Sequence, residues 1–250
     1  MPRQNPESPK TVLGKVRVVL DQFSVERPFL TLTEIIDGCG LPKPTVFRLL
    51  QELTELGFVA QKGKSYRLGL VSYRLGMVAK QQFHLEEFLD DLLAPLAQKI
   101  GETIITATLE NNQIMYLHVV ESKRPLRYVV GAGARRDIPF GATSMALLCQ
   151  LSDEDQRAIL HPPFQLFTEK TITSLEEYLT RLKLARDKQI VMECGEYYDG
   201  IMAIAVPIFT RQPLSITVVG PEERVRPNEN LIVALLRETA VEFGKIELYL

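Results

Sequence analysis

The sequence predicts an α+β protein with a small, mostly helical N-terminal part and a larger part that combines an antiparallel sheet with helices. Apolar residues recur at three- and four-residue steps before residue 57, as in packed helices. After residue 100, β-rich runs alternate with helical segments. Residues 1–80 hold twelve Lys and Arg against seven Asp and Glu, whereas 81–250 hold seventeen against twenty-four. A basic part joined to an acidic one is typical of a polyanion-binding module attached to a second domain.

The composition narrows the class of protein. A chain of 250 residues with 46% hydrophobic residues can build one large domain or two modest ones. Its three cysteines form no CxxC pair, so neither a disulfide framework nor a zinc knuckle is expected. No run approaches the roughly 18 to 20 apolar residues of a membrane span. We therefore expect a soluble, cytoplasmic protein without a membrane partner.

Two helices are expected before residue 40. The first runs from Val12 to Phe23, and the residues on its apolar face are Val12, Leu13, Val16, Val19, Leu20 and Phe23. Thr31 and Glu34 have the spacing of a capping box, in which each side chain accepts a hydrogen bond from an otherwise unpaired backbone N–H. They open a short second helix, whose buried side consists of Leu32, Ile35, Ile36 and Cys39.

A third helix is expected from about Lys43 to Leu56. Gly40 permits a tight turn before it, and the prolines at 42 and 44 fit its first turn. Its apolar side consists of Val46, Leu49, Leu50, Leu53 and Leu56. The other side points away from the core and carries Thr45, Phe47, Arg48 and Gln51.

A basic hairpin is expected after this helix. Gly57 ends the helix, and Phe58–Gln61 and Ser65–Leu68 are predicted to pair as short strands about a Lys-Gly-Lys turn. Helix, helix, turn, helix and basic hairpin, in this order, make a winged helix-turn-helix. That motif places one helix in the major groove of DNA and the hairpin against the phosphates.

The same geometry assigns roles to the exposed side chains. Thr45 and Arg48 would read or position base edges, and Phe47 would contact a thymine methyl group. The side chains that would anchor phosphates are Lys43, Lys62, Lys64 and Arg67. A three-helix protein-interaction domain with a solvated basic surface is the alternative interpretation.

A connector and a second domain are expected after the hairpin. Helical spacing continues over Leu70–Lys80 and Leu85–Ile100, with a boundary near 80–84 and a kink at Pro95. The predicted strands are Thr103–Leu109, Ile114–Val120, Leu126–Val130, Ile190–Met192, Ile201–Phe209 and Leu214–Val219. The predicted helices are Thr143–Leu151, Asp153–Leu160, Ser174–Lys188 and Pro227–Tyr249. The four-residue link Glu110–Gln113 between the first two strands favours an antiparallel sheet.

Signals for enzymatic chemistry are weak. Gly131-x-Gly133 lacks the third glycine of a dinucleotide loop, so it predicts a turn. The three histidines stand far apart, without the spacing of zinc ligands. A thiol of Cys149 or Cys194 paired with His118 stays open, because such partners need only be neighbours in space. We expect no catalytic residue, no metal and no cofactor.

Several runs of the N-terminal part match one known family in order and spacing. They are Thr31–Ile36, Gly40–Leu50, Leu53, Gly57–Val59 and Tyr66–Gly69. These runs resemble the DNA-binding half of IclR-type bacterial transcriptional regulators, which usually have Ser at the position of Pro44 and often His at that of Phe47. The DNA-binding set expected from pattern and resemblance together is Lys43, Pro44, Thr45, Phe47, Arg48, Lys62, Lys64 and Arg67.

The C-terminal part carries a looser match. Gly200–Ile208, Val218–Pro221 and Arg224 resemble the end of the effector-binding domain of the same family, and Ile138–Cys149 resembles the segment that leads into its first pocket helix. The resemblance implies a GAF-like fold with the effector on the sheet beneath that segment. The lining that it implies is Leu126, Tyr128, Ala142, Thr143, Glu193, Ala203, Thr217 and Val219. Departures from the family pattern near that helix leave the ligand class open.

The implied lining residues also have plainer interpretations. Ala203, Thr217 and Val219 suit an ordinary sheet core. The Tyr197–Tyr198 pair forms either an aromatic wall or part of the surface, and Glu193 is equally a solvated loop charge. A Glu193 that faces the pocket would need a ligand hydroxyl or amine as its hydrogen-bond partner, because an unpaired buried carboxylate is costly.

Taken together, these features predict a ligand-responsive, DNA-binding transcriptional regulator. Its domains would be a winged helix-turn-helix at 1–80 and an effector-binding domain, including the linker helix, at 81–250. The expected partners are a double-stranded DNA operator, a small-molecule effector of the organic-acid class, and further copies of the chain in a homodimer or homotetramer, since one recognition helix buries too little surface to select a site. The competing interpretations are a metabolic enzyme with an accessory basic domain and a protein-interaction module.

Overall fold

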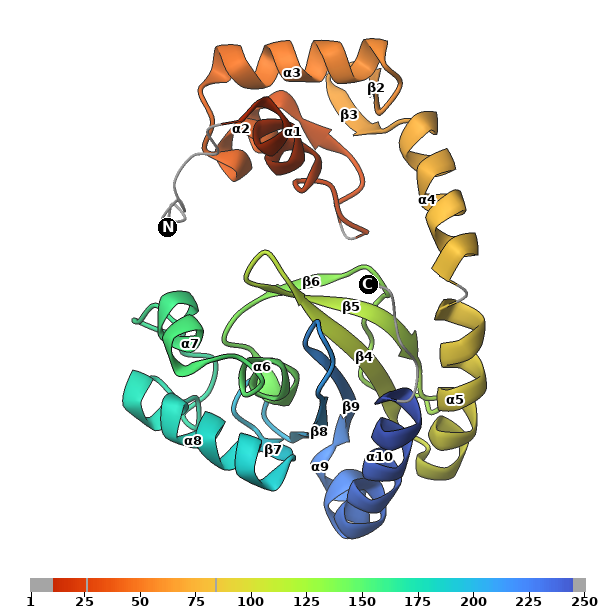
Figure 1. The fold of residues 1–250 in the computed structure, drawn as a ribbon, viewed down its shortest axis with the longest axis vertical. Coiled ribbons are helices and arrows are strands. Elements are labelled where there is room, and N and C mark those ends of the chain that lie inside the picture. The colour runs from red at the N-terminus through yellow and green to blue at the C-terminus, as the bar shows by residue number, and fades with distance from the viewer. Residues whose placement is uncertain (1–10, 26, 84, 245–250) are drawn as a thin grey trace. The chain divides into compact units, whose positions relative to one another are not determined.

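The computed structural model describes residues 11–25, 27–83 and 85–244 (Figure 1). The chain divides into two compact units, Met1–His84 and Leu85–Leu250, and each has its own apolar core. None of the helices in this described part of the chain combines the length and the apolarity that crossing a bilayer requires.

The N-terminal unit contains short helices and a small antiparallel sheet. Its elements are α1 (Val12–Leu20), β1 (Leu30–Thr31), α2 (Leu32–Cys39), α3 (Lys43–Glu55), β2 (Val59–Lys62), β3 (Ser65–Leu68) and α4 (Leu70–Phe83). The strand order is β1-β3-β2, so the hairpin β2–β3 is extended by a two-residue strand that precedes α2. The order of these elements is the winged helix-turn-helix predicted from the sequence, with β1 as an unpredicted addition.

The capping box at the start of α2 is confirmed. The Thr31 hydroxyl accepts a hydrogen bond from the Glu34 N–H, and Glu34 Oε2 accepts one from the Thr31 N–H at 2.7 Å. Gly40 ends the helix with a left-handed φ of 63°, which favours glycine because it has no Cβ. Helix α2 is thus capped at both ends, and α3 begins at Lys43, three residues after Gly40.

One core holds α1, α2, α3 and the hairpin together. Its buried residues are Val19, Phe23, Leu30, Ile35, Cys39, Leu41, Val46, Leu49, Leu50, Leu53, Val59 and Tyr66. Helix α1 ends earlier than predicted, at Leu20, because the N–H groups of Gln22 and Phe23 bond to carbonyls three residues back and tighten the chain. Val12 and Leu13, expected on the buried face, are 60% and 80% exposed.

Leu56 is a second correction in this unit. It was expected on the apolar side of the third helix, but it is 64% exposed. The helix ends at Glu55, and Gly57, with φ of 76°, turns the chain into β2. Leu56 therefore lies past the last turn that faces the core.

The C-terminal unit combines one sheet with several helices. Its strands are β4 (Thr103–Glu110), β5 (Gln113–Val120), β6 (Arg135–Asp137), β7 (Val191–Cys194), β8 (Ile201–Ile208) and β9 (Leu214–Pro221). Its helices are α5 (Leu85–Ile100), α6 (Gly141–Leu148), α7 (Asp153–Ile159), α8 (Leu175–Lys188), α9 (Glu222–Val225), the 3₁₀ turn η1 (Arg226–Asn228) and α10 (Glu229–Gly244). The strands form one antiparallel sheet in the order β6-β5-β4-β9-β8-β7.

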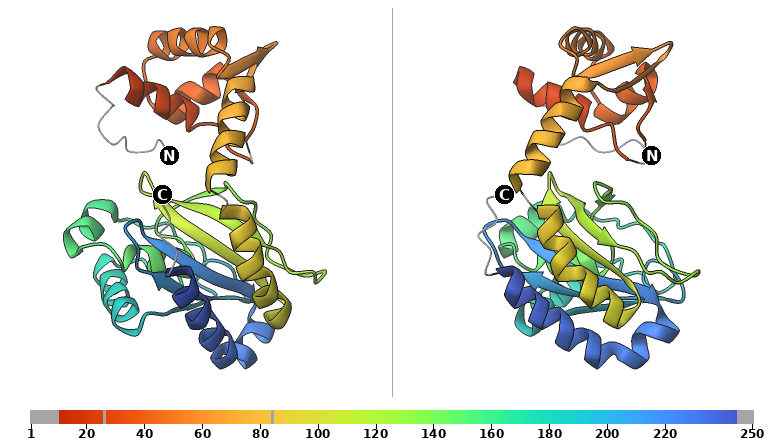
Figure 2. Two further views of the ribbon diagram at one scale, coloured as in Figure 1. Left: turned by 45° about the vertical axis from the view of Figure 1, so that its right-hand side comes forward. Right: turned by 90° about the vertical axis from the view of Figure 1, so that its right-hand side faces the viewer.

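Both faces of this sheet are covered, as Figure 2 shows. Alternate residues point to opposite faces of a strand, so Ile104 packs with α5 and α10 whereas its neighbour Ile105 packs with α6 and α8. Central strands buried on both faces explain why β8 and β9 are apolar almost throughout. The architecture is the α+β fold with an antiparallel sheet predicted from the sequence.

The connection between β4 and β5 is shorter than expected. Glu110 and Gln113 are paired strand residues, which leaves Asn111 and Asn112 as the loop. Both have left-handed φ angles, 51° and 59°, and asparagine tolerates this region better than most residues. The predicted hairpin is correct, with a two-residue loop.

The predicted strand at Leu126–Val130 is wrong. Leu126 lies in a bend, and residues 127–130 have no regular secondary structure. Side chains hold two carbonyls of the segment: Thr103 Oγ1 donates to Tyr128 O at 2.8 Å, and Arg224 donates to Leu126 O at 2.8 Å. The edge strand beside β5 is β6, whose charged sequence gave no β signal.

The other predicted elements are of the right type and differ at their ends. Helix α6 begins at Gly141, two residues before the predicted start, and α10 begins at Glu229 after the turn η1. Strand β7 continues to Cys194. The last residues of the predicted closing helix, after Gly244, lie outside the described residues.

Candidate functional site

The exposed side of α3 is the first candidate surface. Pro44 lies in the first turn, where its missing N–H is no loss, and Pro42 O accepts from the N–H groups of Thr45 and Val46. Lys43, Pro44, Phe47 and Arg48 are exposed, Phe47 to 45%, while Thr45 is partly buried. The opposite side packs Val46, Leu49, Leu50 and Leu53 into the core. The helix is thus held by one side and leaves the other open.

The hairpin supplies the second group of cations. Lys62 pairs in register with Ser65, and Gly63 turns the chain between them with φ of 62°. Lys62, Lys64 and Arg67 are all exposed. Because β2 follows closely after the end of α3, one compact unit carries every residue of the predicted DNA-binding set.

Arg48 has one ionic contact on this surface. Its Nε lies 3.7 Å from Glu52 Oε1, and both side chains are more than half exposed. Exposed pairs of this kind contribute about 0 to 1 kcal/mol, so Arg48 can exchange Glu52 for another anion at little cost.

An inner cavity of about 30 Å³ is the second candidate site, and it lies between the start of α6 and the sheet. Its lining comes from Ile105, Tyr116, Tyr128, Phe140, Gly141, Ala142, Thr143, Glu193, Tyr197, Tyr198, Ile201, Ala203, Thr217 and Val219. The hydroxyls of Thr143 on α6 and Thr217 on β9 are hydrogen bonded at 2.9 Å. The cavity therefore combines apolar walls with a few polar groups that converge, as ligand sites do.

Glu193 is the charged group of the inner cavity. It is 5% exposed, and its Oε1 accepts a hydrogen bond from the Glu196 N–H at 2.6 Å. Burial raises the pKa of Glu193 to about 7, an effect that the Glu196 N–H opposes. Arg181 forms its ion pair with Glu196, at 3.1 Å, and not with Glu193. The Glu193 carboxyl can thus accept or donate a hydrogen bond near neutral pH.

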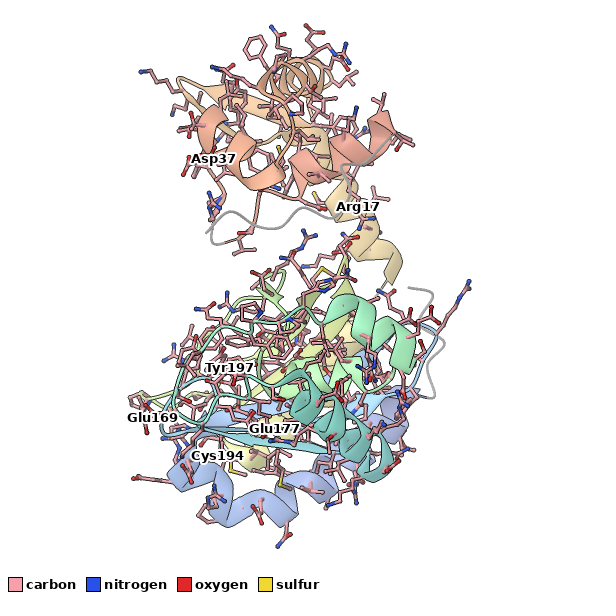
Figure 3. All side chains as sticks on the ribbon, turned by 90° about the vertical axis from the view of Figure 1, so that its left-hand side faces the viewer. Arg17, Asp37, Glu169, Glu177, Cys194 and Tyr197 are labelled. Atoms are coloured by element: carbon pink, nitrogen blue, oxygen red, sulfur yellow. The ribbon has the colours of Figure 1, made fainter. Side chains whose placement is uncertain are left out.

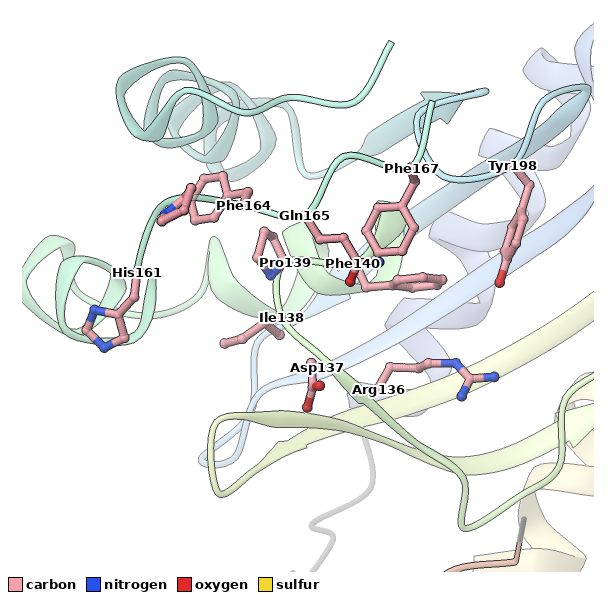
Figure 4. A pocket seen from close by; sticks show the side chains of 11 residues that line it. Arg136, Asp137, Ile138, Pro139, Phe140, His161, Phe164, Gln165, Phe167 and Tyr198 are labelled. Carbon is pink, nitrogen blue, oxygen red and sulfur yellow. The ribbon is translucent and has the colours of Figure 1, made fainter. Parts of the chain in front are cut away.

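An outer cleft of about 420 Å³ opens beside the inner cavity (Figure 4). Its polar lining residues are Arg136 and Asp137 from β6 and His161 and Gln165 from the segment after α7. Phe140 and Tyr198 line both the cleft and the cavity. The two spaces are therefore adjacent compartments of one region.

An aromatic cluster stands between the two compartments. The Phe140 ring centroid lies 4.5 Å from that of Tyr197, 5.8 Å from that of Phe167 and 6.2 Å from that of Tyr198. Tyr197 is buried and donates its hydroxyl to Pro139 O at 2.8 Å, whereas Tyr198 is 47% exposed. We refer to Phe140, Phe167, Tyr197 and Tyr198 as the aromatic partition.

The structure brings together seven of the eight residues expected around the effector. Those that line the inner cavity are Tyr128, Ala142, Thr143, Glu193, Ala203, Thr217 and Val219. Leu126 is the correction: it is 69% exposed, because its segment is held by Arg224 through the backbone and its side chain points away from the core. The Tyr197–Tyr198 pair belongs to the lining as well.

Several residues of this region were missed from the sequence, among them five that line the inner cavity: Ile105, Tyr116, Phe140, Gly141 and Ile201. Tyr116 lines the inner cavity, and its alternation with Ile114 along β5 was the available signal. Arg136 lines the outer cleft, and the pattern of the sequence did not mark it as a ligand-binding residue. No sequence signal placed β6 beside β5.

The thiol pairings left open by the sequence are not brought together. Cys149 packs in the core on the α6 side, whereas His118 lies 3.0 Å from Asp90 of α5 on the other face. A β-bulge in the pairing of β4 with β5 puts His118 on that face. Burial raises the pKa of Cys149 to about 12, which disfavours the thiolate. Cys194, opposite Tyr197 in Figure 3, is on β7, with three strands between it and β5.

Comparisons with known proteins give consistent matches. The model of the IclR helix-turn-helix domain matches residues 12–63, and that of the bacterial transcriptional regulator IclR C-terminal domain matches residues 77–244. The HTH-type transcriptional regulator KdgR of Escherichia coli is 31% identical over 252 residues, covering 96% of this chain and 95% of the relative. KdgR of Dickeya chrysanthemi is 34% identical over 211 residues, covering 83% and 68%.

Solved structures share the fold. A structure from Silicibacter sp. TM1040 has a TM-score of 0.85 at 24% identity and covers 94% of this chain and 95% of that chain. A structure of an IclR homologue from Microbacterium hydrocarbonoxydans, complexed with 4-hydroxybenzoate, has a TM-score of 0.75 at 23% identity and covers 94% and 98%.

Proposed function

Because this chain belongs to the IclR family of bacterial transcriptional regulators, we propose that it binds operator DNA through α3 and the β2–β3 hairpin and responds to an effector in its C-terminal domain. We assign DNA binding to residues 1–80 and effector binding to residues 81–250. A regulator of chromosomal genes would act in the cytoplasm, where the DNA is.

The open side of α3 is the observation that carries this proposal. Lys43, Phe47 and Arg48 are exposed on a helix whose other side is fixed in the core. An α-helix fits the major groove, where Arg48 would donate to base edges or phosphates and Phe47 would contact a thymine methyl group. Pro44 offers no side-chain donor, so polar contacts of the first turn would come from Lys43 and Thr45.

The hairpin cations support the same role. Lys62, Lys64 and Arg67 would neutralise phosphates beside the groove that α3 enters. Such contacts position the protein on any duplex, while the α3 contacts select the sequence.

Salt-dependent binding of the full chain to duplex DNA tests this proposal. The probe is duplex DNA from the region upstream of the gene that encodes this chain, and binding is measured by fluorescence anisotropy. The logarithm of the binding constant should fall linearly with the logarithm of the salt concentration, because each phosphate contact releases condensed counterions. A scrambled duplex of equal length should bind more weakly with a similar slope. Equal binding to both duplexes, or none, would contradict sequence-specific recognition.

The inner cavity is proposed as part of the effector site. Thr143, Thr217 and Glu193 offer polar groups on an apolar floor, which suits a small organic acid that also carries a hydroxyl. The relative from Microbacterium hydrocarbonoxydans holds 4-hydroxybenzoate, a compound of that class. Thermal-shift screening with 4-hydroxybenzoate and other small carboxylates should raise the Tm of this chain when a ligand binds only the folded state.

Helix α4 supports self-association. Leu70, Tyr73 and Met77 recur at helical spacing and are 83%, 66% and 55% exposed, an apolar stripe that a second copy would cover. A homodimer or homotetramer would present recognition helices to a palindromic operator. Light scattering after size exclusion should give a dimer or tetramer mass, and Tyr73→Lys should lower it; a monomeric wild-type chain would contradict this part.

Effector binding would change operator affinity by a shift of populations. A ligand alters the balance between two arrangements of the C-terminal domains only by the difference in its affinity for them. Whether the response is repression or activation would depend on the position of the operator.

A further inference from the structure

Arg136 is a cation placed for ligand binding that has no described carboxylate partner. It forms no ion pair with any described residue; its guanidinium donates a long hydrogen bond, 3.4 Å, to the carbonyl of Arg135 and another hydrogen bond to the hydroxyl of Tyr128. Of its neighbours, Arg135 pairs with Glu110 at 3.0 Å, and the exposed Asp137 carboxylate accepts a hydrogen bond from the Gln113 amide at 2.6 Å. A partly buried guanidinium left without an anion is costly, so its place needs an explanation.

The register of β6 aims Arg136 at the ligand face of the sheet. Arg136 is paired with Ile114, and residues opposite each other in an antiparallel pair point to the same face. Ile114 and Tyr116 pack into the core beneath α6, on the side that holds the inner cavity. Arg135, the preceding residue, points to the other face and pairs with Glu110, whereas Asp137 lies at the outer cleft beside Arg136. Arg136 is thus the cation of β6 that reaches the region of the effector.

The position of Arg136 in the outer cleft agrees with this register. Figure 4 shows its side chain extending toward the side of the cleft where Tyr198 stands. Burial and Tyr198 raise the pKa of Tyr128, and the charge of Arg136 acts in the opposite direction. Tyr128 itself lines the inner cavity, so the guanidinium lies next to the boundary between the two compartments.

The sizes of the compartments restrict how a ligand can bind. The inner cavity, about 30 Å³, has room for a terminal group, since a water molecule already needs roughly 10 to 15 Å³ on this measure. The outer cleft, about 420 Å³, has room for the body of a small molecule. The aromatic partition between them consists of side chains, and one of these, Tyr198, is 47% exposed.

We propose that the effector is an elongated hydroxy acid that spans both compartments, with its carboxylate on Arg136 in the outer cleft and its hydroxyl among Glu193, Thr143 and Thr217 in the inner cavity. This inference rests on the proposed function and adds the elongated form of the effector and the residue that binds its carboxylate. The planar guanidinium binds a carboxylate through two parallel hydrogen bonds, which are stronger than bonds between neutral groups. The aromatic partition would cover the chain between the two polar ends.

Binding of matched acids and amides to the full chain tests the inference. The probes are 6-hydroxyhexanoate and 4-hydroxybenzoate, each compared with its primary amide by isothermal titration calorimetry. The wild-type chain should bind at least one acid about tenfold or more tightly than the amide, because only the acid forms a charge-assisted pair. Arg136→Gln should bring acid and amide within about twofold of each other.

Arg135→Gln is the matched control. It removes the same charge from the adjacent residue, which points to the opposite face, and should leave the preference for the acid unchanged. A preference that survives Arg136→Gln, or that Arg135→Gln abolishes equally, would overturn the inference and place the carboxylate elsewhere, for example at the start of α6. Failure of both acids to bind the wild-type chain would also overturn it, while DNA binding and a neutral effector, and so the proposed function, would stand.

Discussion

Glu193 on β7 accepts a hydrogen bond from the backbone N–H of Glu196, with 2.6 Å between the nitrogen and Oε1. The bond ties the strand end to the loop that carries Tyr197 and Tyr198. Glu193 is thus both a wall of the inner cavity and a support for the aromatic partition, and its protonation state bears on both.

The stability of the C-terminal unit should depend on pH through Glu193. Its pKa is about 7 in the folded protein and 4.5 in an exposed chain, so the folded state binds more protons between these values. Stability should therefore fall as pH rises from 4.5 to 7. Glu193→Gln should equal the wild type near pH 4 and exceed it by up to roughly 3 kcal/mol at pH 8. Urea unfolding at both pH values measures this; a difference independent of pH would refute it.

Arg224 should be needed to keep Glu102 buried. The Glu102 side chain is 2% exposed, and Arg224 donates to both of its oxygens at 2.6 and 2.8 Å. Arg224→Ala should cost roughly 3 kcal/mol of unfolding free energy, because it leaves a buried carboxylate with only the longer 3.7 Å contact from Arg124. Adding Glu102→Gln should restore part of the loss in denaturant titration. Additive losses in the double variant would contradict the pairing.

Two leucines near the end of α3 should differ sharply in their effect on stability. Leu53 is 5% exposed and Leu56 is 64% exposed. Leu53→Ala should cost about 2 to 5 kcal/mol, as buried leucines do. Leu56→Ala should stay within about 0.5 kcal/mol of the wild type. Thermal unfolding of the two variants compares them directly, and equal losses would show that α3 extends into the core as the sequence pattern suggested.

Arg48 and Lys64 should affect DNA binding in different ways. Arg48→Ala should lower affinity for the operator about 10- to 100-fold with little change on a scrambled duplex, because α3 contacts bases. Lys64→Ala should weaken all duplexes about equally and reduce the salt slope by about one. Lys183→Ala, on α8 of the other unit, is the charge-matched control. Sequence-selective loss in Lys64→Ala would contradict its placement against phosphates.

The sequence predicted best where local rules decide the structure. The capping box of Thr31 and Glu34 forms as expected, and the three- and four-residue spacing of apolar residues around Val46 and Leu49 correctly marks the buried side of α3. These features depend on neighbours three or four residues away, which the sequence displays directly.

The errors arose where distant contacts decide. The β-rich segment of Leu126 and Tyr128 is no strand, because Arg224 and Thr103, far away in sequence, hold its carbonyls. The charged residues of β6 form a strand because the edge of β5 is free to pair with them. Local propensity could foresee neither, and the ligand-facing position of Arg136 was missed for the same reason.

The sheet of the C-terminal unit is bordered by its two shortest strands, β6 with three residues and β7 with four. Open backbone at a border invites a foreign strand, and brevity together with the charges of Arg135, Arg136 and Asp137 makes such recruitment unfavourable. Strand pairing between the sheets of different molecules is therefore unfavourable. The strand that carries Arg136 thus also disfavours fibrous aggregation of the protein in concentrated solution.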